Sequence, residues 1–428
     1  MFRWTRRLVP VFIAIVGAAC ASATSAAATD ISPPTITAPL GGVGPYTAGT
    51  VVTFTFTETG AGAPVSYQYT VNGGATQTVP APSGTANVSI VPARQHNQLI
   101  AYAVAADGTV SAGTSDEFYA NAATPAADKD LNGDGRPDLL TVGNTAGLAP
   151  GLWQATGRPA AGAGRTGQVT VPASDIGING NGFSSPGSPA DFNGAQAVTG
   201  QFFGDGFQDV LLYYPSGIHA GGGMVLAGQG DGSALGPYSG STCTITQGIL
   251  TDFNGGNPLQ VANAYASING TGLPDLLATS GDATNGYYLD YYYAPSPCLF
   301  IQAFAIKTPT PDGTPDWNRW TLATLSDGSG MEMFLWNQSA GALYLWRGVT
   351  AHDNGDGTGT LSYTQYRISP HWQQGRPLST LEAANLNGDG VPDLWAVTPD
   401  GVARAYLISH LSAKGPAEIE PQRPQKLS

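Results

Sequence analysis

A nine-residue segment occurs twice in the chain, as DLNGDGRPD at 130–138 and as NLNGDGVPD at 385–393. Oxygen-bearing side chains stand at positions 1, 3, 5 and 9 of each copy: Asp130, Asn132, Asp134 and Asp138, then Asn385, Asn387, Asp389 and Asp393. Such a set of carboxylates and amides would repel itself without a hard cation at its centre, and Ca²⁺ takes about six to eight oxygen ligands. The backbone carbonyls at position 7, from Arg136 and Val391, complete the expected calcium ligands.

The two segments begin like EF-hand loops but do not end like them. An EF-hand needs a bidentate acid at position 12 and flanking helices, whereas position 12 here is Thr141 or Ala396. The residues that follow, 139–142 and 394–397, form apolar runs typical of strands. The sequence therefore predicts calcium loops within a β-sheet.

Three weaker copies of the segment lie between the two intact ones, at 204–209, 269–275 and 329–333. Successive copies are 71, 66, 58 and 60 residues apart, counted between their closing residues, Asp138, Asp209, Asp275, Met333 and Asp393. Each copy is followed by an apolar run, a glycine-containing turn and a second strand-like run. A repeat of about 60 residues with several short strands is typical of a β-propeller, in which no blade buries its faces alone.

These loops and their spacing make residues 123–412 similar to the FG-GAP/VCBS repeat family, which also builds the head of integrin α-subunits. The resemblance implies a propeller of four-stranded blades with Ca²⁺ in the loops of one rim, and metal at the two intact copies. The second and third copies replace ligands, with Gln201 and Phe203 in one and Ser267 and Thr271 in the other, which argues against metal there. The fourth copy has lost its closing carboxylate. Five visible copies imply a small ring, or further blades that have diverged.

Residues 29–122 have a different pattern. Val52, Phe54 and Phe56 alternate with threonines, as in a half-buried strand, and a run from Val65 to Val71 repeats this period before a tight Asn-Gly turn. Several strands in fewer than 100 residues predict a β-sandwich. The segment resembles bacterial immunoglobulin-like domains, and an Ala-rich stretch at 120–128 is the expected boundary.

The two ends of the chain allow separate predictions. Residues 1–28 contain three arginines, an apolar run and an Ala-rich end, and we expect them to be a secretory signal peptide, exported by the general or the twin-arginine route. Cys20 allows the alternative of a lipid anchor. Residues 413–428 are predicted to be a polar tail. No transmembrane span is expected, because the apolar run is too short.

The mature chain would retain two cysteines, Cys243 and Cys298. An even number of cysteines in an exported protein favours a disulfide. The separation of the two cysteines along the chain is close to one repeat, so the bridge would join neighbouring blades. Two buried thiols are the alternative. The formal net charge of −13, without a basic stripe, argues against nucleic acid as a partner.

No linear catalytic motif is present, and no catalytic residue is predicted. The five histidines are scattered without metal-ligand spacing: His96, His219, His352, His371 and His410. An Asp-Asn-Gly-Asp-Gly run at 353–357 is predicted to be a hairpin tip, with a further ion loop as the alternative. One aromatic group could either stack on sugars or fill the core: Tyr287, Tyr288, Tyr291, Tyr292, Tyr293, Trp317 and Trp320.

These observations predict an all-β, exported, calcium-binding protein with an immunoglobulin-like sandwich before an FG-GAP/VCBS propeller. The expected role is non-catalytic binding or adhesion to an extracellular glycan or protein. The alternative is a carbohydrate-active hydrolase or lyase whose site lies on a propeller face.

Overall fold

The computed structural model describes residues 31–39, 44–58, 60, 62–160, 165–184, 186–236, 243–328 and 330–428. The predicted signal segment, Cys20 and Ser329 of the fourth copy lie outside these residues. The fold is all-β, as expected, and its helical elements in the described part are three 3₁₀ turns: η1 (Gly143–Thr145), η2 (Pro189–Phe192) and η3 (Trp317–Arg319). Within the same residues, no helix has the length and apolarity needed to cross a membrane.

The amino-terminal domain is a two-sheet β-sandwich. One sheet has the order β1 (Thr35–Thr37), β3 (Val52–Thr57), β6 (Thr85–Ile90), and the other β2 (Tyr46–Thr47), β8 (Thr114–Asn121), β7 (His96–Val104), β4 (Ser66–Val71), β5 (Gln77–Pro80). The alternation predicted for β3 is observed, because Phe54 and Phe56 are fully buried. Phe54 packs on Phe118 of the facing sheet at 4.9 Å between ring centroids. Asn72 and Gly73 both have positive φ, as the predicted tight turn requires.

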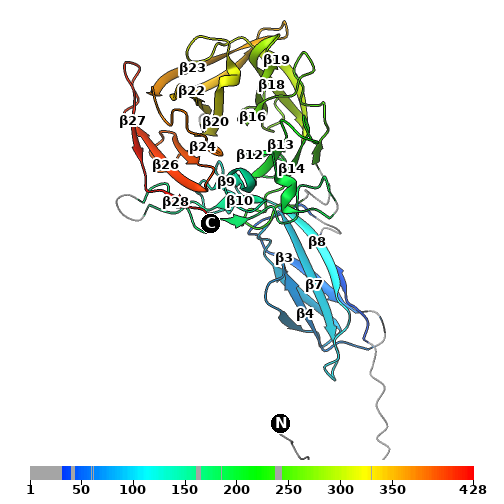
Figure 1. The fold of residues 1–428 in the computed structure, drawn as a ribbon. Coiled ribbons are helices and arrows are strands. Elements are labelled where there is room, and N and C mark those ends of the chain that lie inside the picture. The colour runs from blue at the N-terminus through cyan, green and yellow to red at the C-terminus, as the bar shows by residue number, and fades with distance from the viewer. Residues whose placement is uncertain are drawn as a thin grey trace, which may run out of the picture.

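Five antiparallel blades follow and form a ring (Figure 1). Blade one contains β9 (Leu139–Val142), β10 (Leu152–Ala155) and β11 (Ser174–Asp175); blade two contains β12 (Gln196–Gly200), β13 (Asp209–Tyr213), β14 (Gly223–Leu226) and β15 (Cys243–Ile245). Blade three contains β16 (Gln260–Asn263), β17 (Leu276–Asp282), β18 (Gly286–Ser296) and β19 (Leu299–Ile306), and blade four contains β20 (Trp320–Ser326), β21 (Met331–Asn337), β22 (Ala342–Asp353) and β23 (Thr358–Ser369). Blade five contains β24 (Thr380–Ala384), β25 (Asp393–Val397), β26 (Val402–Ser409), β27 (Glu418–Pro421) and β28 (Gln425–Lys426).

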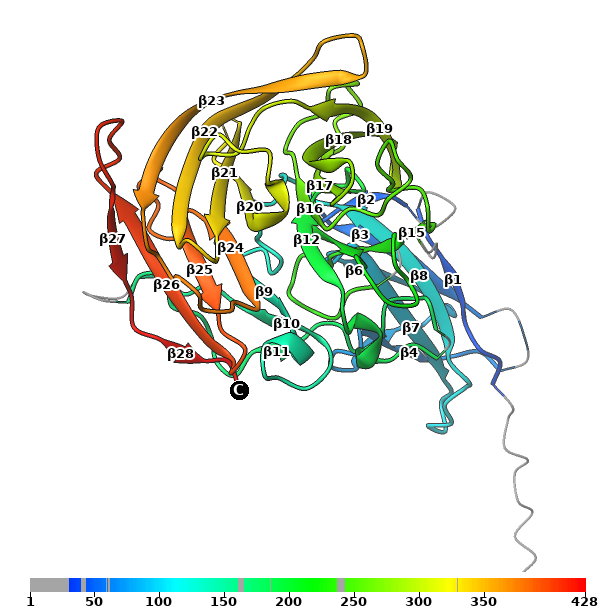
Figure 2. The same cartoon turned by 45° about the horizontal axis from the view of Figure 1, so that its top comes forward.

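The innermost strands β9, β12, β16, β20 and β24 surround the axis (Figure 2). Each contacts its two neighbours, and β9 contacts both β12 and β24, so the ring is closed. Blade one lacks a strand before its loop, which leaves β9 innermost. Blades three and four are also joined at their outer edges by a short parallel pairing of β19 with β23, which merges them into one eight-stranded sheet. Of the two alternatives, a small ring or further blades that have diverged, the described residues show the small ring.

The last blade extends beyond the predicted end of the propeller at residue 412. Residues 418–421 and 425–426, expected to belong to a polar tail, pair with β26 as β27 and β28. The side chain of Gln425 also exchanges two hydrogen bonds with the backbone of Val169 in blade one, at 2.7 and 2.9 Å. Ala173 of blade one donates its N–H to the carbonyl of Leu427 at 2.8 Å. The carboxyl-terminal segment thus closes the ring, which composition alone did not indicate.

A disulfide joins Cys243 in β15 of blade two to Cys298 in the β18–β19 turn of blade three. The prediction that it would connect neighbouring blades is confirmed. The run at 353–357 lies at the tip of the β22–β23 hairpin, as predicted, where Asn354 N–H donates to the Thr358 carbonyl at 2.9 Å. Four of the seven singled-out aromatic residues are buried in the core: Tyr291, Tyr292, Trp317 and Trp320. These four cannot offer an exposed stacking face.

Candidate functional site: the loop face and the axial channel

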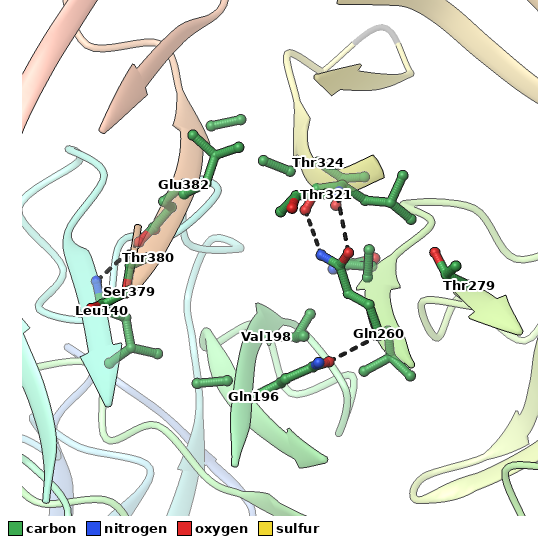
Figure 3. A pocket seen from close by; sticks show the side chains of 18 of the residues that line it. Leu140, Gln196, Val198, Gln260, Thr279, Thr321, Thr324, Ser379, Thr380 and Glu382 are labelled. Carbon is green, nitrogen blue, oxygen red and sulfur yellow. Dashed lines mark hydrogen bonds between the residues drawn. The ribbon is translucent and has the colours of Figure 1, made fainter. Parts of the chain in front are cut away.

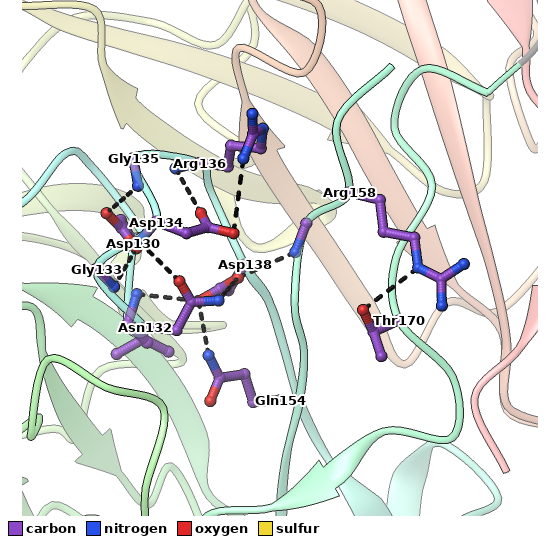
Figure 4. Close-up of polar contacts among 12 residues, drawn as sticks. Asp130, Asn132, Gly133, Asp134, Gly135, Arg136, Asp138, Gln154, Arg158 and Thr170 are labelled. Atoms are coloured by element: carbon purple, nitrogen blue, oxygen red, sulfur yellow. Dashed lines mark hydrogen bonds and ion pairs between the residues drawn. The ribbon is translucent and has the colours of Figure 1, made fainter. Parts of the chain in front are cut away.

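The first intact loop is wound around the carboxylate of Asp130 (Figure 4). One oxygen of Asp130 accepts hydrogen bonds from the N–H groups of Gly133 and Asp134, and the other accepts from Gly135 at 2.8 Å. Gly133 and Gly135 have φ of 77° and 81°, a conformation that favours glycine. Asn132 and Asp134 each accept an N–H from two residues further on, at 2.9 Å.

Asp138 closes this loop and is fully buried. Its carboxylate accepts from Leu131 N–H at 3.1 Å, Gln154 Nε2 at 2.6 Å and Gly157 N–H at 3.0 Å. Burial raises the pKa of Asp138 to about 7, and the nearby Asp130 carboxylate adds to the rise, while these hydrogen bonds oppose it. Asp138 therefore joins the loop to β10 and to the residues that follow β10, in addition to any metal that it binds.

The second intact loop repeats this arrangement. Asn385 accepts from Gly388 N–H at 2.9 Å, and buried Asp393 accepts from Leu386 N–H at 3.1 Å and Ile408 N–H at 2.8 Å. Burial raises the pKa of Asp393 to about 7, with a contribution from Asp389.

The same joining role occurs in two degenerate copies. Asp209 accepts from Phe203 N–H at 3.0 Å and Gly228 N–H at 3.2 Å. Asp275 accepts from Ile268 N–H at 2.8 Å, Ala294 N–H at 2.9 Å and the Tyr291 hydroxyl at 2.9 Å. The repeat thus preserves a buried carboxylate that links loop and strands where other calcium ligands are missing. Sequence reasoning assigned the closing aspartate to metal alone and did not predict this role.

The residues of the intact loops have the chemistry of a calcium site. Every side chain that could bind the ion offers an oxygen atom. In each loop a second acidic residue raises the pKa of the closing aspartate, and a bound cation would relieve this repulsion. Within the described residues, no three His, Cys, Asp or Glu side chains gather closely enough to form a metal site by themselves. The second loop has Asn385 where the first has Asp130, so it offers one carboxylate fewer and two of its side-chain ligands would be amide oxygens. Its would-be ligands are Asn385, Asn387, Asp389, the carbonyl of Val391 and Asp393; those of the first are Asp130, Asn132, Asp134, the carbonyl of Arg136 and Asp138.

The connections that precede β9, β13, β17, β21 and β25 meet on one face of the propeller, here called the loop face. They frame a cavity of about 730 Å³, lined from blade one to blade five by Gly135, Pro137, Gln201, Gln208, Ser267, Gly272, Ser326, Asp327, Asn385 and Gly388. Gly135, Gly272 and Gly388 have no other atoms within 4 Å of a Cβ position, so backbone is open to a ligand there.

A second cavity of about 630 Å³, the axial channel, lies among the innermost strands, on the side of the propeller opposite the loop face (Figure 3). Gln196 on β12 accepts from Val261 N–H at 3.1 Å and donates to the Leu259 carbonyl at 2.8 Å. Gln260 on β16 does the same to both backbone groups of Leu322 on β20, at 3.1 and 2.8 Å. Each glutamine amide thus joins one inner strand to the next.

Glu382 on β24 makes the corresponding contact with blade one by a single oxygen. Its Oε2 accepts from Leu140 N–H at 3.1 Å, while Oε1 is buried without a hydrogen-bond partner. Burial raises the pKa of Glu382 to about 7; the Lys129 ammonium opposes this rise, and Asp128 and Asp138 add to it. Figure 3 shows Glu382 lying across from Thr324 of β20.

Lys129 lines the axial channel, and Tyr265, which it contacts, lines both cavities. This buried lysine donates to the Tyr265 hydroxyl at 2.8 Å and the Thr324 carbonyl at 3.0 Å, and it pairs with Asp128 at 3.4 Å. The Tyr265 hydroxyl in turn donates to Asp128 at 2.8 Å. The group was not predicted, since its members come from the domain linker and blades three and four.

The linker before Lys129 runs along the loop face. Ala122 N–H donates to the Asp205 carbonyl and Ala126 N–H to the Gly206 carbonyl, at 2.9 and 2.8 Å. Beside it, the sandwich contacts blade two where Arg94 forms an ion pair with Asp231. The sandwich is therefore tied to the rim near the first two loops.

The histidines do not form a site. His96 stacks on Tyr119, His219 stacks on Phe183, and His352, His371 and His410 lie on different surface turns and strands. A comparison with models of known protein families gives no match for this chain, and a comparison with curated proteins gives none either. The function is therefore inferred from the geometry of the two cavities.

Proposed function

We propose that this protein is an exported, calcium-binding β-propeller of the FG-GAP/VCBS type that binds an extracellular glycan or protein on its loop face, without turnover. The observation that carries this proposal is the convergence of all five connections around one cavity of about 730 Å³. A cavity of this size fits one or a few sugar residues or a side chain of a partner protein. The sandwich would act as a spacer.

Calcium would act on the shape of this cavity. Glycines at its rim leave backbone groups open to hydrogen-bond a ligand, but such loops keep one conformation only if they are held. The ion would be bound by Asp130, Asn132, Asp134, Arg136 and Asp138, and by the equivalent set at 385–393. Removing it would leave the acidic groups to repel each other, so ligand binding should require Ca²⁺.

Export is part of the proposal. A disulfide is typical of oxidising compartments, and it agrees with the predicted signal segment at 1–28. The mature chain would begin near residue 29 and carry the sandwich and propeller outside the cell.

Glu382 supports a second candidate function, a carbohydrate-active hydrolase. A carboxyl group with a pKa of about 7 in a polar central cavity has the properties of a general acid. The two carboxylates that add to this rise in pKa already accept hydrogen bonds, Asp128 from Tyr265 and Ser326 and Asp138 from Gln154. The binding function is therefore favoured.

A glycan array and a panel of matrix proteins, probed with the mature chain in Ca²⁺ and in chelator, test the proposal. The expected result is binding that chelator abolishes and that Asp393→Ala weakens at least tenfold, with no released product. Hydrolysis of a bound glycan that Glu382→Gln abolishes would instead establish the second candidate. Binding that is equal in Ca²⁺ and chelator would contradict the role given to the loops.

A further inference from the structure

We propose that Arg347 of β22 is a positioning residue for the calcium ion of the second intact loop, at 385–393. This inference deepens the proposed function and rests on it, because the loop must bind an ion. Arg347 belongs to blade four, and its Nη2 donates to the Gly390 carbonyl of blade five at 3.1 Å. A side chain of one blade thus contacts the ligand loop of the next.

This contact holds one peptide unit in the middle of the loop. The carbonyl of the unit, from Gly390, accepts from Arg347. Its N–H, from Val391, donates to Asp389 Oδ1 at 2.7 Å. Gly390 has φ of 78° and, as a glycine, can change its backbone conformation at little cost. Hydrogen bonds on both edges of the peptide therefore limit its rotation, and with it the direction of the Val391 carbonyl, which is one of the expected ligands.

Arg347 is itself held by two carboxylates of its own blade. Its Nε pairs with Glu332 Oε2 at 2.9 Å, and its Nη2 lies 3.5 Å from Asp327 Oδ2. Glu332 is 2% exposed, so the guanidinium is anchored to a buried acid. The two acids also balance the positive charge of Arg347, which would otherwise oppose a cation in the neighbouring loop. Arg347 can therefore act on the loop through its hydrogen bond.

The second loop needs such a partner more than the first. It offers one carboxylate fewer, and its position 7 is Val391, whereas position 7 of the first loop is Arg136. The Arg136 side chain lies 3.8 Å from Asp134 within its own loop (Figure 4). An arginine of the neighbouring blade contacts the second loop instead, and it does so through the backbone.

Loss of this contact should weaken Ca²⁺ binding at the second loop alone. We expect Arg347→Met to weaken it about tenfold, the lower end of what groups that orient metal ligands contribute to affinity. Arg347→Lys should have a similar effect, because one ammonium does not reproduce the fork that joins Glu332 to Gly390. Arg367→Met changes an exposed arginine of the same blade and is the matched control, which should bind like the wild type.

Calorimetric Ca²⁺ titration of the mature chain measures this effect, with Asp138→Ala as the background that isolates the second loop and Asp393→Ala as the one that isolates the first. Arg347→Met should lower the affinity in the Asp138→Ala background and leave it unchanged in the other. Wild-type affinity of the second loop in Arg347→Met, or an equal loss at both loops, would overturn the proposal. Wild-type affinity in Arg347→Lys would also overturn it, because charge alone would then suffice.

Amide hydrogen exchange in chelator tests the positioning role in single variants, without the two backgrounds. Arg347→Met should speed exchange within 385–393 and leave exchange within 130–138 unchanged, and Arg367→Met should alter neither loop. Two bound ions in the wild type, with unaltered exchange in Arg347→Met, would overturn this proposal and leave the proposed function intact. A wild-type chain that binds no Ca²⁺ would overturn both.

Discussion

Glu382 differs from the glutamines of the other inner strands in what its second oxygen can do. Gln196 and Gln260 each accept one backbone N–H and donate to one carbonyl of the next blade. Glu382 accepts the Leu140 N–H but leaves Oε1 buried and unpaired. Each glutamine therefore joins two blades through both its amide oxygen and its amide nitrogen, whereas Glu382 joins two blades through only one of its oxygens.

Replacement of Glu382 by glutamine should stabilise the protein above neutral pH. The folded pKa of about 7 exceeds the ordinary 4.5, so the folded state binds more protons between these values. The contribution of Glu382 to stability is then greatest below about pH 4.5 and falls as the pH rises through 7. Urea unfolding at pH 5 and pH 8 should show Glu382→Gln gaining about 1–3 kcal/mol over the wild type at pH 8 and much less at pH 5.

The matched control is Gln260→Glu, which places the same unpaired oxygen where an amide donates to the Leu322 carbonyl. It should destabilise the protein, and more at pH 8 than at pH 5. A Glu382→Gln variant that is less stable than the wild type at pH 8 would show that the carboxylate is satisfied in solution.

At the scale of elements, the closing aspartates have two roles that can be separated. Asp138, Asp275 and Asp393 all accept loop and strand N–H groups, but only Asp138 and Asp393 close a complete set of calcium ligands. Changing each to alanine should destabilise the protein by about 3 kcal/mol, since buried donors lose their acceptor. Metal analysis should show one ion lost in Asp138→Ala and in Asp393→Ala.

Asp275→Ala and Met333→Ala serve as controls for that experiment, because neither belongs to a complete ligand set. Both should retain the metal content of the wild type, and Asp275→Ala should nevertheless be destabilised. If all four variants hold the same amount of Ca²⁺, the assignment of the ion to the two intact loops is wrong.

The disulfide stabilises the contact between blades two and three. Cys243 and Cys298 close a chain segment of 55 residues. Changing both to serine should lower the free energy of unfolding by about 4 kcal/mol in the chain-entropy model. Chemical denaturation measures this, and adding a reductant to the wild type should give the same loss. Equal stability with and without reductant would mean that the bridge does not constrain the unfolded chain.

Elements formed by neighbouring residues were predictable, and those formed by ring closure were not. Alternation at Val52–Thr57 predicted β3, and the position of Asp138 before an apolar run predicted β9. By contrast, Lys129, Tyr265 and Glu382 meet only because five blades close around one axis, and nothing in the local sequence of any of them indicates the others. The loop oxygens were predictable because they lie within nine residues.

At the scale of the whole molecule, the carboxyl-terminal segment closes the ring between blades five and one. Leu427 is 1% exposed and packs with residues of both blades. Leu427→Ala should destabilise the protein by about 2–5 kcal/mol, because it removes a large buried side chain. Thermal unfolding checks this, with exposed Lys426→Ala as the control. If the two variants have the same midpoint, the segment does not hold the ring together.

The proposed binding function depends on calcium holding the loop face in one shape. At free Ca²⁺ of about 100 times its dissociation constant, each site adds about 2.7 kcal/mol to stability, so an effect on unfolding is expected as well as direct binding. The most direct measurement is a calorimetric Ca²⁺ titration of the metal-free mature chain, followed by thermal unfolding with and without chelator. We expect two ions per chain and a lower midpoint in chelator. No binding, together with an unchanged midpoint, would contradict it.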